Sequence, residues 1–113
     1  MRYSYEQIGT VCATFSCTPE VRTGQVCQMF GNDCVCMADE DSDFDGVVVG
    51  KRDTCVAVVV RGFVTVPYTG VAPYVGNTCL HADGTGCVCV ASGGKSYLVV
   101  SVDPDNETVT FLL

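Results

Sequence analysis

The sequence predicts an all-β fold, a small single-domain β-barrel or sandwich, and three observations support this prediction. Turn-forming pairs recur about every eight to twelve residues, as at Gly31-Asn32, Asp45-Gly46, Asp83-Gly84 and Gly93-Gly94. The runs between them are short and rich in valine, a β-branched residue that favours strands. No stretch of about a dozen residues spaces its apolar side chains at the period of a helix.

The first half of the chain contains four expected strands, and turn-forming residues separate them. They cover Thr10–Phe15, Gln25–Phe30, Cys34–Ala38 and Gly46–Gly50. Pro19 follows the first of these strands, so any helical turn around Thr18–Arg22 is brief. An acidic loop follows the third.

Five further strands are expected in the second half, where glycine and proline again mark the turns. They cover Thr54–Val66, Thr78–His81, Gly86–Ala91, Ser96–Asp103 and Glu107–Leu112. The first of them contains Arg61-Gly62, where we expect a bulge or a sharp bend. The 113 residues are enough for one domain, 1–113, with a core of its own.

Two parts of the chain, approximately 24–60 and 76–112, share a sequence pattern. The octapeptide GNDCVCMA at 31–38 returns as GTGCVCVA at 84–91, and a Gly-X-X-Cys segment precedes each copy. A polar loop, a valine-rich strand, a turn and another strand follow in both parts. Two copies favour a barrel or sandwich built from two similar β-hairpin units, each covering the apolar face of the other.

Nine cysteines invite a disulfide or metal interpretation, but the count is odd and the N-terminus lacks the apolar segment of a secretion signal. We therefore expect cytosolic synthesis and reduced thiols. Cys-X-Cys on a strand places both thiols on one face, a spacing poorly suited to zinc. We expect the cysteines to fill the core as small hydrophobes, with no metal and no cofactor. The alternative is a cysteine-rich metal-binding β module that uses the cysteines of both Cys-Val-Cys segments, Cys34, Cys36, Cys87 and Cys89, with His81 as a further ligand.

The other features with chemical potential are weak. Asp39–Gly46 matches the first half of a calcium-binding loop, but Arg52 stands where the last ligand, a glutamate, is needed. His81 is the only histidine, and no nucleophile or acid–base pair accompanies it locally, so we expect no catalytic residue and no enzyme. A net charge of −7 argues against nucleic acid and membrane as primary partners.

A composition that is 48% hydrophobic suggests that some apolar surface lies at a subunit interface. The doubled Pro-Tyr-X-Gly unit either crosses the end of the barrel or presents Tyr68 and Tyr74 to a partner. The apolar C-terminus, Val109–Leu113, adds Phe111 and Leu113 as interface candidates.

Several segments together resemble small phage capsid-decoration (cement) proteins and the base domains of phage head fibres. They are Asp45-Gly-Val-Val-Val49, Val58-Val-Val-Arg-Gly-Phe-Val-Thr-Val-Pro67, Gly76-Asn-Thr-Cys-Leu-His-Ala-Asp-Gly84 and Thr108-Val-Thr-Phe-Leu-Leu113. The resemblance covers most of the chain after about Val21, although those families usually carry valine, alanine or threonine where this chain has cysteine. It implies a compact β-barrel that often forms trimers and binds the outer surface of an icosahedral shell, without catalytic residues. The expected partners are then other copies of the chain and the major capsid protein lattice. The expected location is the bacterial cytoplasm at synthesis and the virion surface afterwards.

Overall fold

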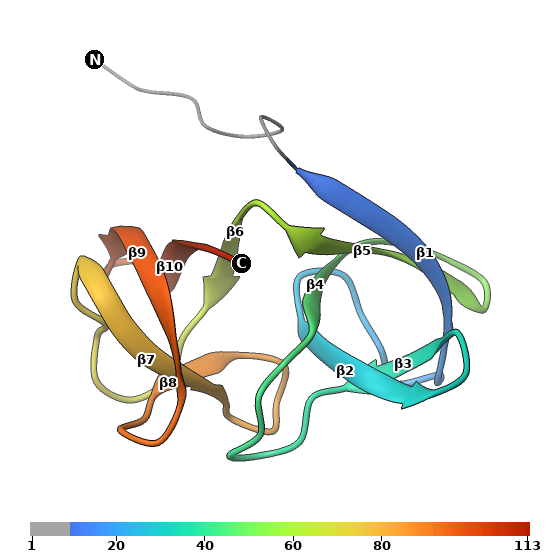
Figure 1. Cartoon of the computed structure of the whole chain (residues 1–113), viewed down its shortest axis with the longest axis horizontal. Coiled ribbons are helices and arrows are strands. Elements are labelled where there is room, and N and C mark those ends of the chain that lie inside the picture. Colours follow the sequence, from blue (N-terminus) through green and yellow to red (C-terminus); the bar gives the residue numbers. More distant parts are fainter. Residues whose placement is uncertain (1–9) are drawn as a thin grey trace.

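The computed structural model describes residues 10–113, and this part of the chain contains ten strands and no helix (Figure 1). The predicted all-β class is confirmed. The strands are β1 Val11–Cys17, β2 Val26–Gly31, β3 Cys34–Met37, β4 Gly46–Arg52, β5 Cys55–Arg61, β6 Phe63–Pro67, β7 Gly76–Ala82, β8 Val88–Val90, β9 Lys95–Asp103 and β10 Thr108–Leu112. Each predicted strand has a counterpart, and the run predicted as Thr54–Val66 is divided into β5 and β6.

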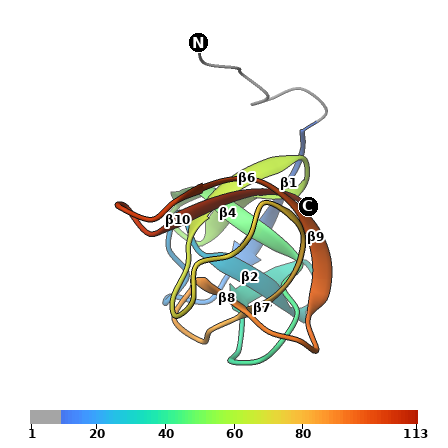
Figure 2. The same ribbon diagram turned by 90° about the vertical axis from the view of Figure 1, so that its left-hand side faces the viewer.

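Two units lie side by side along the longest axis, as Figure 1 shows. The first unit, residues 10–61, is a closed barrel with the strand order β1-β3-β2-β4-β5. The second unit, residues 63–113, is a five-stranded sheet with the order β6-β10-β9-β7-β8. Figure 2 views the second unit from the front, with the first behind it.

The strand order of the first unit recurs in the second. In the first unit β2 pairs with β3 and β4, and β5 pairs with β4 and β1. In the second unit β7 pairs with β8 and β9, and β10 pairs with β9 and β6. β1 also pairs with β3 in parallel, and a single parallel bridge from Tyr68 to Val88 takes the corresponding place after β6. The two units therefore have the same strand pairings, although only the first closes into a barrel.

A one-residue irregularity also recurs. The register between β4 and β5 shifts between Val48 and Gly50, which leaves Val49 as the extra residue. The register between β9 and β10 shifts in the same way between Val99 and Ser101, which leaves Val100 extra. Such bulges bend a strand and increase its twist. Val47 and Leu98 occupy equivalent positions in the two units, because each lies two residues before the extra residue of its strand.

Two clusters of buried side chains form the core. One cluster fills the closed barrel and includes Val35, Val48 and Val58. The other combines the inner side of the second sheet with apolar residues from the outside of the barrel, among them Val47 and Val59. Because successive side chains of a strand point to opposite faces, β4 and β5 contribute to both clusters. The two units thus share one core and form a single domain.

The sharp bend expected at Arg61-Gly62 lies at the junction between the units. Gly62 has a φ of 121°, a conformation that residues with a side chain rarely adopt. A Cβ atom at this position would also lie 2.9 Å from the Thr10 hydroxyl oxygen. Gly62 therefore permits both the turn and the close approach of Thr10, the residue before β1.

Candidate functional site

The two Cys-Val-Cys segments present their valines to the core, and this corrects the expectation that their cysteines fill it for all but Cys36, which is buried. Val35 and Val88 are fully buried. Their neighbours, Cys34 and Cys36 in the first unit and Cys87 and Cys89 in the second, therefore lie on the outward faces. All nine cysteines are free. Only Cys27 and Cys36 are buried, two are exposed and the other five are partly buried.

The two cysteine pairs lie on different sheets. β3 pairs with β1 and β2, whereas β8 pairs with β7. Among residues 10–113, no group of three or more histidine, cysteine, aspartate or glutamate side chains is arranged to hold a metal ion. The geometry of these residues thus gives the metal-binding alternative no support.

The single histidine lies beside a thiol. His81 on β7 is directly opposite Cys89 on β8, so their side chains share one face. Burial, together with the nearby Asp83, Asp41 and Glu40, raises the pKa of the Cys89 thiol. Burial likewise raises the pKa of the Cys87 thiol. A thiol with a raised pKa is a weaker nucleophile near neutral pH than one whose pKa is lowered.

Asp83 organises the hairpin that carries these cysteines. Its carboxylate accepts hydrogen bonds from the Thr85 backbone N–H at 2.7 Å, the Thr85 hydroxyl at 2.8 Å and the Thr69 hydroxyl at 2.8 Å. The Cys87 N–H donates to it at 3.2 Å. Burial opposes ionisation of Asp83, but these hydrogen bonds outweigh it and lower the pKa. The bonds from Thr85 and Cys87 stabilise the turn itself, and the bond from Thr69 joins the turn to the segment that follows β6.

The acidic loop is exposed at its carboxylates but anchored at both ends. Asp39 accepts a hydrogen bond from Gln28 at 3.0 Å, and Asp45 accepts one from the Met29 N–H at 2.9 Å. The backbone of the loop exchanges two hydrogen bonds with Ala82, each 3.0 Å long. Phe44, between these anchors, is buried. The loop thus fastens the first unit to β7.

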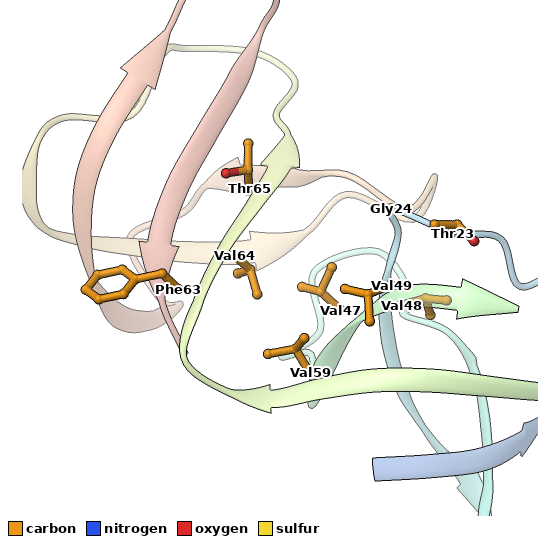
Figure 3. A pocket seen from close by; sticks show the side chains of 9 residues that line it. All are labelled: Thr23, Gly24, Val47, Val48, Val49, Val59, Phe63, Val64 and Thr65. Atoms are coloured by element: carbon orange, nitrogen blue, oxygen red, sulfur yellow. The ribbon is translucent and has the colours of Figure 1, made fainter. Parts of the chain in front are cut away.

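A groove of about 310 Å³ lies between the units (Figure 3). β4 and β5 form one wall, and β6 forms the other. The lining consists of glycine, threonine, valine and phenylalanine: Thr23, Gly24, Val47, Val48, Val49, Val59, Phe63, Val64 and Thr65. This lining contains no charged side chain, no histidine and no cysteine.

The four interface candidates from the sequence fall in different environments. Tyr74 is 73% exposed, and Leu113 is partly buried against the core. Tyr68 and Phe111 are buried, so their side chains are not available to a partner of the folded chain. Phe111 points inward because it alternates with Thr110 and Leu112 on β10, whose other inward residue is Val109.

Sequence reasoning missed the most exposed apolar residues near these candidates. Val71 and Val75 flank Tyr74 in the connection between β6 and β7, and both are exposed. Leu98 and Leu112 lie opposite each other on β9 and β10 and are also exposed. The alternation of the polar Thr108 and Thr110 with the apolar Val109 and Phe111 is the signal that would have placed Leu112 on the outward face.

No protein family matches this sequence, and no curated protein is significantly similar to it. In the part of the chain that the structure describes, no helix is long and apolar enough to cross a membrane.

Proposed function

We propose that this chain is a structural, non-catalytic protein of a phage or prophage virion, of the capsid-decoration or head-fibre-base type. Its partners in this proposal are the major capsid protein lattice and other copies of itself, with a trimer as the favoured state. It is made in the cytoplasm of the bacterial host and then binds the outer capsid surface. The resemblance described above supports this assignment.

The observation that carries the proposal is the loop between β6 and β7. Val71, Tyr74 and Val75 are 69% to 73% exposed there, although large apolar side chains rarely gather in water on a monomer without a binding role. The loop is also held in place. Pro73 is buried, and the Thr78 hydroxyl donates a hydrogen bond to the Tyr74 carbonyl at 2.8 Å. A fixed loop with an exposed tyrosine suits docking on a protein surface, because little entropy is lost on binding.

Charge supports a protein partner as well. The chain carries 13 acidic and 6 basic residues, a balance that disfavours binding to nucleic acid. The carboxylates of the loop Asp39–Asp45 are exposed. They therefore remain in solvent or face a basic patch on the shell, since burial of several like charges is costly.

Co-sedimentation with capsid shells of the phage or prophage that encodes the chain tests the proposal. The wild type is expected to sediment with the shells, and Tyr74→Ser is expected to bind about tenfold more weakly or worse, as for a tyrosine at the centre of an interface. Phe30→Ser is the control, because Phe30 is 69% exposed but lies on the first unit. A wild type that stays in the supernatant, or a Tyr74→Ser variant that binds as well as the wild type, would contradict the proposal.

A further inference from the structure

A row of apolar side chains crosses the outside of the closed barrel. Val26, Val47 and Val59 lie opposite one another on the adjacent strands β2, β4 and β5. We call them the inner row. Their sequence neighbours Val48 and Val58 point into the barrel instead. The inner row is at most 5% exposed, because it belongs to the core cluster that the second unit completes.

The second unit carries the same row at equivalent positions. Asn77, Leu98 and Leu112 lie opposite one another on β7, β9 and β10, which are the counterparts of β2, β4 and β5. We call them the outer row. The inward neighbours of the two leucines, Val99 and Phe111, are buried. The outer row is open, with Leu98 43% and Leu112 37% exposed.

The burial of the inner row indicates which kind of surface is suited to cover the outer row. Within one chain, this row of a β unit is buried against a second unit with the same strand connections. The outer row keeps two apolar residues at the matching positions, although nothing within residues 10–113 buries them as the inner row is buried. We propose that the outer row is a docking surface for a second copy of this chain.

The side chains beside the outer row limit the charge repulsion between two copies and give a basic partner no carboxylate to pair with. The cross-strand set beside the outer row contains only hydroxyl side chains, Thr65, Thr110 and Ser101. The hydroxyl groups of Thr65 and Thr110 are hydrogen-bonded to each other at 2.8 Å. Two copies that each carry a net charge of −7 repel each other through their acidic surfaces, so contact is least opposed where carboxylates are lacking. The outer row and the set beside it form such a surface.

This inference rests on the self-association part of the proposed function and does not depend on capsid binding. The contact between copies that we infer does not use the interface candidates predicted from the sequence. Leu112, not Phe111, is the residue that β10 offers to another copy.

Light scattering over a concentration series tests the inference. The wild type is expected to rise above the monomer mass of 12.0 kDa as its concentration increases. The double variant Leu98→Ser/Leu112→Ser is expected to remain at the monomer mass. The matched control is Met29→Ser/Phe30→Ser, whose two side chains are also exposed but lie on the first unit, and it is expected to associate like the wild type.

A second variant guards against an effect on folding. Asn77→Asp places a negative charge in the outer row without removing any packed side chain, and it too is expected to stay monomeric. If these variants associate like the wild type, the surface is wrong while self-association stands. If the wild type itself stays monomeric, both are wrong, and neither result depends on whether the chain binds capsid shells.

Discussion

Phe44 of the acidic loop stacks on Tyr97 of β9, with ring centroids 5.2 Å apart and ring planes 10° apart. Phe111 of β10 completes the cluster, with centroid distances of 5.9 Å to Phe44 and 5.1 Å to Tyr97. One ring thus comes from the loop between β3 and β4 of the first unit and two come from the second. The acidic loop Asp39–Asp45 thus carries exposed carboxylates and, through Phe44, also supplies part of the core that the two units share.

Replacement of Phe44 by alanine is expected to lower the free energy of unfolding by about 3–5 kcal/mol, because it removes a buried ring and leaves a cavity between the units. Urea denaturation followed by circular dichroism measures the change. Phe30→Ala removes the same ring from an exposed position and is expected to change stability by about 0.5 kcal/mol or less. Equal effects of the two substitutions would show that the cluster does not hold the units together.

Alkaline pH is expected to weaken the same cluster. Burial, with the nearby Asp43 and Asp45, raises the pKa of Tyr97 from its ordinary value of 10.0 to about 12. The unfolded chain therefore loses this proton first, and stability is lost as pH rises from about 10 to about 12. Tyr97→Phe removes the titrating group, so its unfolding free energy should fall less over this range than that of the wild type. Parallel curves for the two proteins would contradict the assignment.

Asp83→Asn is expected to destabilise the fold by about 1–3 kcal/mol at neutral pH, because a charged acceptor of several hydrogen bonds is lost. The pKa of Asp83 is lowered by its hydrogen bonds, so its contribution is present above its ordinary pKa of 3.8 and is lost as pH falls through the lowered value. The difference between the variant and the wild type should therefore shrink in acid. Asp105→Asn makes the same change at an exposed position and serves as the control. A difference that persists unchanged at low pH would argue against the carboxylate as its source.

The orientation of the Cys-Val-Cys segments predicts unequal costs for neighbouring residues. Val88→Ala should cost about 2 kcal/mol through lost burial and a cavity, since Val88 is fully buried. Cys89→Ala should cost less, because Cys89 is partly exposed on the outward face. Chemical denaturation of the two variants measures both costs. If Cys89→Ala were the more destabilising, the assignment of faces would be reversed.

The positions of the strands could be predicted because turn residues and valine-rich runs are local signals. Gly62 shows how far this goes: the sequence marked a bend there, and the structure turns the chain from β5 into β6 at that residue. The face of each strand was harder to assign. Cys34 and Cys36 share a face by alternation, but alternation alone does not say whether that face is inside or outside.

Burial between the units could not be predicted from local patterns either. Val47 and Leu98 occupy equivalent positions and are both apolar, yet the first is buried and the second is exposed. The second unit covers Val47, whereas no part of residues 10–113 buries Leu98 in the same way. This difference depends on how the whole chain is arranged. The same limit applies to Phe44, whose acidic neighbours indicate a solvated loop.

Gly62 brings the two ends of the described chain together. Its carbonyl accepts a hydrogen bond from the Leu113 N–H at 2.9 Å, and a Cβ atom on Gly62 would lie only 3.0 Å from the Cα of Thr10. A short linker from residue 113 to residue 10, in place of residues 1–9, would therefore close the backbone into a ring. The ring could be reopened at the exposed turn of Ser92 and Gly93, which interrupts no strand. The fold is thus suited to circular permutation, with new termini placed away from the junction of the two units.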